Sequence, residues 1–268
     1  MRKLIGLSLA LFIAFPLTSA WAALDWTAAL SGDHRSEKNT QRDAFRHPQA
    51  TLEFFGLEAD MTVIELSPSG GWYTEVLAPL LAAEGNYYAA HNAPNGSAYS
   101  RRSLGGYLQK LGKDNDRYGK VMVTTLAPPE FVAIAPAGSA DMVLAFRNVH
   151  SWMGENTIAA VFSAAFDGLK PGGVFGVVQH RAKDGRDVET MKKTAYVSEG
   201  FVIAAARSVG FELAGRSEVN ANPKDPADHA QGVWELPPSL GGEEKERAAK
   251  RAIGESDRMT LKFVKPAS

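Results

Sequence analysis

Short apolar runs alternate along this chain with longer segments of mixed polarity, and the alternation predicts strands separated by helices. Each run is rich in apolar or β-branched residues, as expected for strands that are covered on both faces of a sheet. The predicted strands are 62–66, 86–90, 121–124, 142–146 and 174–178. The predicted helices between them are 72–83, 100–111 and 156–169. This order favours an α/β fold with a doubly wound, mostly parallel sheet.

The pattern changes after the fifth predicted strand. A helix at 197–209 and a sixth strand at 211–217 lead into a segment rich in Asn, Pro and Asp, at about 219–240. This segment exceeds ordinary loop lengths, which indicates an active-site cover or an ordered functional loop. A charged helix at about 243–252 follows, and a last strand is predicted at 258–264.

The first residues have the three parts of a secretory signal peptide. A positive start (RK at positions 2 and 3) precedes an apolar stretch at 4–17 that is short for a membrane span, and the small-x-small sequence AWA follows. We therefore expect residues 1–22 to be removed, and an uncleaved membrane anchor is the alternative. Ala23 is not Cys, so a lipoprotein is not expected. The remainder, 23–268, is predicted to be a single domain with a helical lead-in at about 30–58, periplasmic or secreted in a bacterium, with no further membrane span.

Composition narrows the chemistry. The sequence contains no cysteine, which excludes thiol catalysis, thiolate zinc sites and iron–sulfur clusters. The formal charge of -1 becomes -3 once Arg2 and Lys3 are removed, so no basic excess favours a nucleic acid as partner. We expect a small molecule as the partner. An exported chain of this length can bury enough core without disulfides.

One candidate site follows the first predicted strand, in the sequence VIELSPSGGWYTEVLAPLL that begins at Val63. An apolar strand runs into a turn of Ser, Pro and Gly, and the turn opens onto a helix, which is how nucleotide-type sites are often built. Glycine in such a turn permits positive φ and lets the backbone approach a ligand closely. A purely structural turn is the alternative.

Three of the histidines share a placement at the ends of predicted strands. His91 follows the second strand, His150 the fourth and His180 the fifth. Because ligands bind outside the carboxyl ends of the strands in an open parallel sheet, these side chains are candidates for a common site. Alternatively, each is a hydrogen-bonded histidine at a strand end or at the surface. Arg42 and Arg46 of the lead-in either cover this site or form a solvated helix face, and we favour the solvated face.

Three further sequences carry a resemblance to a known family. LKPGG at 169–173 precedes the fifth strand, GFE at 210–212 precedes the sixth, and RMTLKFVKP at 258–266 forms the last. In this order they resemble class I S-adenosylmethionine-dependent methyltransferases. A closer resemblance, over nearly all of 23–268, is to a group of exported bacterial proteins predicted to be methyltransferases. The shared sequences are RHPQATLEFFG, GGWYTEVLAP, YYAAH, FRNVHSWM, GVVQHRA and NANPKDPADHAQGVWELPPSL.

The resemblance implies a seven-stranded, methyltransferase-like Rossmann sheet with an antiparallel last strand, and S-adenosylmethionine as cofactor. In the family, an acidic residue precedes three glycines at alternate positions. Here Glu65 is the acidic residue, and Ser67, Ser69 and Gly71 occupy the glycine positions. The backbone around Gly70 and Gly71 is expected to face the methionine carboxylate, helped by the helix N-terminus. The two serines keep small side chains, so the resemblance implies an altered cofactor site.

The resemblance also assigns roles at the strand ends. His91 stands where the family has an acidic residue that binds both ribose hydroxyls, and a neutral imidazole offers only one donor and one acceptor. With the family's strand order 3-2-1-4-5, His150 and His180 end neighbouring strands about 4.8 Å apart and could reach one ligand. We predict His150 as catalytic base or substrate orienter, with His180 second. We also predict Asn148 as a catalytic residue, because it lies in the stretch where the family places substrate-facing groups.

These observations support three hypotheses. The first is an exported methyltransferase that uses S-adenosylmethionine on a small molecule. The second is a cofactor-free, methyltransferase-like protein that binds a ligand in the cell envelope, because a fold alone does not fix chemistry. The third is a metal enzyme using His91, His150 and His180, although the sequence lacks a helical HExxH pair and our predicted site contains no metal. The sequence predicts neither the methyl acceptor nor the oligomeric state.

Overall fold

The structure is a computed structural model that describes residues 23–267. The predicted signal peptide and Ser268 lie outside this range. Within it, no helix combines the length and the apolar character that a membrane crossing requires.

Seven strands form one mixed sheet in the order β3-β2-β1-β4-β5-β7-β6. β7 pairs antiparallel with both β5 and β6, and the other neighbouring pairs are parallel. The predicted fold class, strand order and antiparallel last strand are therefore confirmed. The strands are β1 (Thr62–Leu66), β2 (Asn86–His91), β3 (Met122–Thr125), β4 (Ala140–Phe146), β5 (Leu169–His180), β6 (Glu212–Ser217) and β7 (Arg258–Val264).

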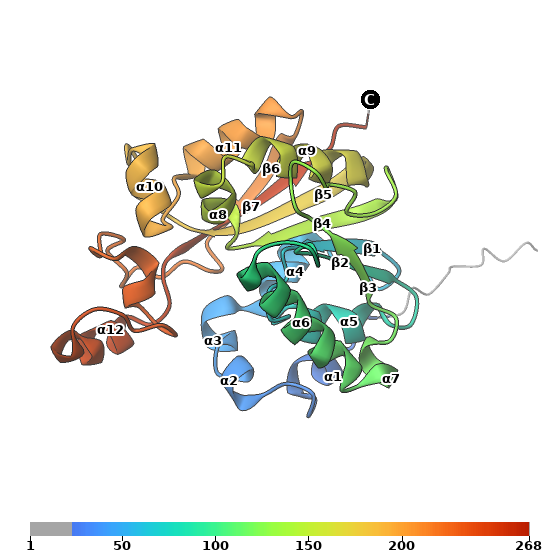
Figure 1. Ribbon diagram of the computed structural model, residues 1–268, viewed down its shortest axis with the longest axis horizontal. Coiled ribbons are helices and arrows are strands. Elements are labelled where there is room, and N and C mark those ends of the chain that lie inside the picture. The colour runs from blue at the N-terminus through green and yellow to red at the C-terminus, as the bar shows by residue number, and fades with distance from the viewer. Residues whose placement is uncertain (1–22, 268) are drawn as a thin grey trace, which may run out of the picture.

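Helices cover both faces of the sheet, as Figure 1 shows. The N-terminal helices lie with α5 to α7 on one face, and α8, α9, α10 and α11 lie on the other. The helices are α1 (Trp26–Ser31), α2 (Glu37–Thr40), α3 (Asp43–Arg46), α4 (Pro48–Phe55), α5 (Thr74–Leu81), α6 (Ala98–Gly112), α7 (Asn115–Tyr118), α8 (Val149–Gly154), α9 (Ile158–Gly168), α10 (Val188–Thr194), α11 (Glu199–Ser208), η1 (Gly232–Glu235), η2 (Glu244–Glu246) and α12 (Arg247–Ile253).

A hydrophobic core lies on each face of the sheet, and the central strands contribute to both. On β1, Val63 packs into the core beneath α5, whereas Ile64 packs into the core beneath α9. The second core contains a group of aromatic rings, in which Phe175 lies 5.0 Å from both Phe162 and Phe211 between ring centroids. Because successive side chains of a strand point to opposite faces, strands buried on both sides read as continuous apolar runs.

Several predicted boundaries differ from the structure by a few residues, and two of the differences have a clear physical cause. The LKPGG sequence, expected as a turn before the fifth strand, belongs to β5. Leu169 pairs with Ala140 of β4, and beyond the end of β7 Gly172 N–H donates to Lys265 O (2.8 Å) and Lys265 N–H donates to Gly173 O (2.9 Å). Pairing with β4 is interrupted there by a register shift. The helix expected from 156 begins instead at Ile158, because Asn156 has a left-handed backbone with φ of 56°.

The lead-in and the long loop flank the carboxyl ends of the strands. In the lead-in, α4 is anchored by the fully buried Leu52 and Phe55. In the loop, the Asn220 side-chain amide donates to the hydroxyls of Thr51 and Thr260, both at 2.9 Å. The loop is thereby tied to α4 and to β7, and its later part lies over the site described next.

Candidate functional site

The turn after β1 has an unusual backbone. Ser67, Ser69 and Gly71 all have positive φ, of 51°, 55° and 73°. These are the three positions at which the resemblance places glycines, and holding a serine there costs roughly 1–3 kcal/mol. A Cβ on Gly71 would lie 2.9 Å from Tyr107 Cε2, whereas a Cβ on Gly70 would meet nothing within 4 Å. The backbone thus keeps the glycine-type path even where the residue is serine.

The amide of Gly71 is already used within this turn, because Gly71 N–H donates to Pro68 O at 2.9 Å. It is therefore not free to bind a carboxylate in this conformation. Neither Gly70 nor Gly71 lines the two cavities described next, whereas Ser67, Pro68 and Ser69 do.

Two cavities of about 300 Å³ each lie at the carboxyl ends of the strands. The first, here called the arginine cavity, lies between the ends of β1, β4, β5 and β7, the lead-in and the long loop. The second, here called the serine cavity, lies between the ends of β2 and β3, the start of α6 and α8. Ser67, Ser69, Asn148 and Ser151 line both. The predicted site residues divide between them: Glu65, His150 and His180 line the arginine cavity, and His91 lines the serine cavity.

Asn148 joins two strand ends at the wall between the cavities. It follows β4, and its Nδ2 donates to Leu66 O (3.0 Å) and Ser67 O (3.2 Å) at the end of β1. In doing so it satisfies carbonyls where the β1 ladder stops. Asn148 therefore fixes the position of the turn after β1.

Glu65 is buried with a single hydrogen-bond partner, the hydroxyl of Tyr87, which donates to it. Burial raises the pKa of Glu65 to about 7, although the Tyr87 hydrogen bond and the charge of Lys110 act in the opposite direction. The carboxyl group is thus partly protonated at neutral pH.

Both ring nitrogens of His91 are bonded within the protein. Nε2 lies 3.0 Å from Ser69 O and donates to it, and Nδ1 accepts from the N–H of Asn92 (2.7 Å). Burial lowers the pKa of His91, so the ring is neutral. A hydrogen bond to a ribose would require one of these partners to be exchanged, and the predicted ribose-binding role of His91 stays a prediction.

His150 is held in one tautomer by Gln179. The Oε1 of Gln179 accepts from Val149 N–H (3.2 Å), so its Nε2 is the donor to Ala195 O (2.9 Å) and to His150 Nδ1 (3.3 Å). The proton of the neutral ring is therefore on Nε2, and burial lowers the pKa of His150 to about 4. His150 can donate a hydrogen bond to a ligand, which suits an orienting role better than that of a base.

His180 lies beside His150, with ring centroids 5.8 Å apart, as the predicted strand order requires. Its Nδ1 is 2.5 Å from the hydroxyl of Ser256. Burial, and then the charge of Arg258, hold the pKa of His180 well below its usual range. Among residues 23–267, no group of three or more His, Asp or Glu side chains is placed to hold a metal ion.

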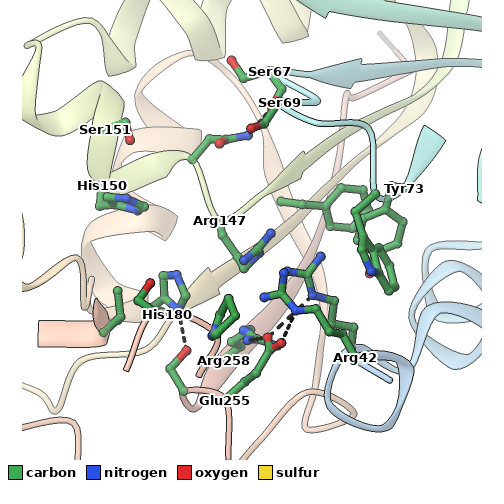
Figure 2. Close-up of a pocket in the computed structure, with 18 of the residues that line it drawn as sticks. Arg42, Ser67, Ser69, Tyr73, Arg147, His150, Ser151, His180, Glu255 and Arg258 are labelled. Atoms are coloured by element: carbon green, nitrogen blue, oxygen red, sulfur yellow. Dashed lines mark hydrogen bonds and ion pairs between the residues drawn. The ribbon is translucent and has the colours of Figure 1, made fainter. Parts of the chain in front are cut away.

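Four arginines give the arginine cavity its charge. Arg42 and Arg46 come from the lead-in, Arg147 follows β4, and Arg258 begins β7 directly opposite His180. Figure 2 shows the side chains of Arg42, Arg147 and Arg258 converging near Glu255. The expectation that Arg42 and Arg46 form a solvated face was wrong, because only 18% and 3% of their side chains are exposed.

Sequence reasoning missed Arg258 and Glu255. The signal that could have found them was the predicted antiparallel last strand. Because that strand runs opposite to its neighbours, its first residue lies at the carboxyl ends of the others.

Comparisons with known proteins agree with this architecture. No protein-family model matches the sequence, and no curated protein sequence matches it. Among solved structures, a SAM-dependent methyltransferase from Aquifex aeolicus is similar with a TM-score of 0.51 and 15% identity, over 84% of this chain and 93% of that one. The chain has the fold of the S-adenosylmethionine-dependent methyltransferases.

Two other solved structures show how that fold is used. A geranyl diphosphate methyltransferase in complex with SAM has a TM-score of 0.55 at 13% identity, over 91% of this chain and 96% of that one. The [4+2]-cyclase SpnF has a TM-score of 0.57 at 14% identity, over 88% of this chain and 85% of that one. The same fold therefore occurs in a protein that is named for a different reaction.

Proposed function

We propose that this chain is an exported S-adenosylmethionine-dependent methyltransferase that acts on a small molecule. The observation that carries the proposal is the pair of adjoining cavities at the carboxyl ends of a sheet with methyltransferase topology, which meet at the turn after β1. Export is supported by the signal-peptide pattern of residues 1–22.

The serine cavity suits the nucleoside part of the cofactor. Its lining combines small or apolar residues, Ala93, Gly96, Leu126 and Ala127, with the neutral ring of His91. Serine and asparagine side chains also line the cavity, and polar groups placed in this way can fix the orientation of a ligand. The amino-acid part of the cofactor would then lie toward Ser67 and Ser69, at the opening into the arginine cavity. When bound, the cofactor supplies an electrophilic methyl group on a sulfonium.

The protein's own contribution is mainly one of positioning. His150 presents an N–H to the arginine cavity, and the low pKa values of His150 and His180 make both poor proton acceptors. A hydrogen bond from His150 to an acceptor oxygen would align that oxygen, and alignment of reactants alone can supply a large part of a rate enhancement. We assign His150 the role of orienting the acceptor.

A second candidate function is favoured by two specific observations. Gly71 N–H is bonded to Pro68 O, and both nitrogens of His91 have protein partners. A methyltransferase-like binding protein without the cofactor accounts for these contacts directly.

Isothermal titration of residues 23–268 with S-adenosylhomocysteine and S-adenosylmethionine separates the two functions. We expect one site for each ligand, and strong weakening in Ser103→Trp, which places a large ring at the edge of the serine cavity. Leu108→Trp is the matched control, because it adds the same ring at a 48% exposed position of the same helix. Absence of heat at millimolar ligand favours the binding protein, and equal affinity of the two variants places the cofactor elsewhere.

A further inference from the structure

The arginine cavity holds more positive charge than its protein partners balance. Four guanidinium groups line it, and Glu255 is the only fully ionised carboxylate among its lining residues, which leaves an excess of three positive charges. Glu65, with a pKa of about 7, is partly ionised at neutral pH and balances part of one of these positive charges. Buried charges are normally paired, so an excess of this size indicates a missing negative partner.

The unused hydrogen-bond donors point to the same conclusion. Glu255 accepts from Arg42 Nε and from Arg258 Nη2. Arg42 Nη2, Arg258 Nε and all three side-chain nitrogens of Arg46 are buried without a hydrogen-bond partner. Arg46 is only 3% exposed and is held over the ring of Trp72, 4.5 Å from the ring centroid. Several guanidinium donors are therefore fixed in place without an acceptor.

Arg147 is the cation most available to a ligand. Its side chain lines the cavity, and no dashed line reaches it in Figure 2. Its backbone has φ of 63°, a left-handed conformation that is costly for a long side chain, and such strained residues cluster at ligand sites. Burial, and then the charge of Arg258, lower the pKa of Arg147 to about 10, which leaves it charged at neutral pH.

We propose that the arginine cavity binds a compact dianionic group, a phosphate or a pair of carboxylates, and that this group belongs to the methyl acceptor. The second part rests on the proposed function. Planar guanidinium groups bind phosphate and carboxylate oxygens in pairs, and two negative charges offset most of the excess. The acceptor class is therefore an organic phosphate or a dicarboxylate of small size, held with His150 beside it.

Geometry separates the Arg258 end of the arginine cavity from the carboxylate of the cofactor, whereas Arg147, which follows β4 next to β1, lies nearer to it. Arg258 lies on β7, which is three strands from β1 in the sheet order and so about 14 Å from it by the usual strand spacing. The turn that is expected to bind the carboxylate of the cofactor directly follows β1. A single carboxylate there would also leave most of the positive excess unbalanced, next to a sulfonium that is itself positive.

The test uses residues 23–268 without cofactor and inorganic phosphate and malonate as probes, in isothermal titration at low salt. We expect both anions to bind, and to bind at least tenfold more weakly to Arg147→Met. Arg207→Met, which removes an exposed arginine of α11, is the matched control and should bind as the unchanged protein does. Arg147→Lys keeps the charge but loses the paired donors, so we expect an intermediate affinity.

Further titrations with the same variants distinguish an anion of the methyl acceptor from the carboxylate of the cofactor. S-adenosylhomocysteine should bind equally to the unchanged protein and to Arg147→Met. A loss of its affinity in Arg147→Met, with methylthioadenosine (which lacks the amino acid) unaffected, assigns the arginines to the cofactor and overturns the proposal. Equal phosphate affinity in Arg147→Met and Arg207→Met also overturns it. Phosphate binding without any binding of S-adenosylhomocysteine supports the anion site and refutes the proposed function.

Discussion

Asn148 offers a sharp test of how the site is held together. Substitution of Asn148 by Asp keeps the size and shape of the side chain but replaces the donor Nδ2 with an oxygen. That oxygen would face Leu66 O and Ser67 O at the distances of the present hydrogen bonds, 3.0 and 3.2 Å. The substitution therefore replaces two attractions with two repulsions.

The expected magnitude follows from these two contacts. Two hydrogen bonds contribute about 1 kcal/mol each, and carbonyls left without partners add about 1–3 kcal/mol. Attraction between the new carboxylate and Arg147 offsets part of this, leaving a loss of about 2 kcal/mol in the free energy of unfolding. For a chain of this size, that loss lowers Tm by about 4–8 °C.

Urea denaturation at pH 7, with calorimetric Tm as a second measure, is the assay. Asn156→Asp is the control, because it makes the same chemical change at an exposed residue with a left-handed backbone. We expect the control to change stability by less than about 0.5 kcal/mol. If the two variants lose equal stability, Asn148 does not fix the turn after β1 as described.

Three further predictions concern the turn and the buried ionisable groups. Gly71→Ala should lower the free energy of unfolding by about 2–4 kcal/mol, because it adds a close contact with Tyr107 to the cost of positive φ. Gly138→Ala is the control, since Gly138 has a similar φ but open space around it, and it should cost about 1 kcal/mol. Equal losses for the two variants in urea denaturation would argue against the close contact at Gly71. Because the pKa of Glu65 is raised to about 7 in the folded state from 4.5, the folded state binds more protons and stability falls as pH rises from about 4.5 to 7. In Glu65→Gln, the free energy of unfolding should fall by about 3 kcal/mol less over this pH range than in the unchanged protein. If the two proteins lose the same stability over this range, the pKa of Glu65 is not raised as described. The pKa of His150 is lowered from 6.5 to about 4, so its contribution to stability is complete above pH 6.5 and is lost as the pH falls toward 4. The free energy of unfolding of His150→Gln should therefore fall less between pH 6.5 and 4 than that of the unchanged protein.

Most of the fold could be predicted from the sequence, because the strands have a local signature. The strand Thr62–Leu66, covered on both faces, is apolar or β-branched except at Glu65, and its bounds are those predicted. The boundary errors came from long-range pairing. LKPGG reads locally as a turn, yet Ala140 of β4 pairs with Leu169, and Lys265, just beyond β7, exchanges backbone hydrogen bonds with Gly172 and Gly173.

The candidate site was predictable only in part. The placement of His91, His150 and His180 followed from the rule that ligands bind at the carboxyl ends of parallel strands. The charge of the arginine cavity did not follow, because its arginines come from three distant segments and arginines are mostly exposed in proteins. Only the sheet order, which brings Arg258 opposite His180, shows that they share one cavity.

The central claim is that the serine and arginine cavities form one continuous ligand site across the ends of β1, β2 and β4. A crystal structure of residues 23–268 with S-adenosylhomocysteine tests it most directly. The account predicts the nucleoside between His91 and Leu126, and the amino-acid end at Ser69, facing His150. Ligand bound outside these cavities, or none at millimolar concentration, would contradict it.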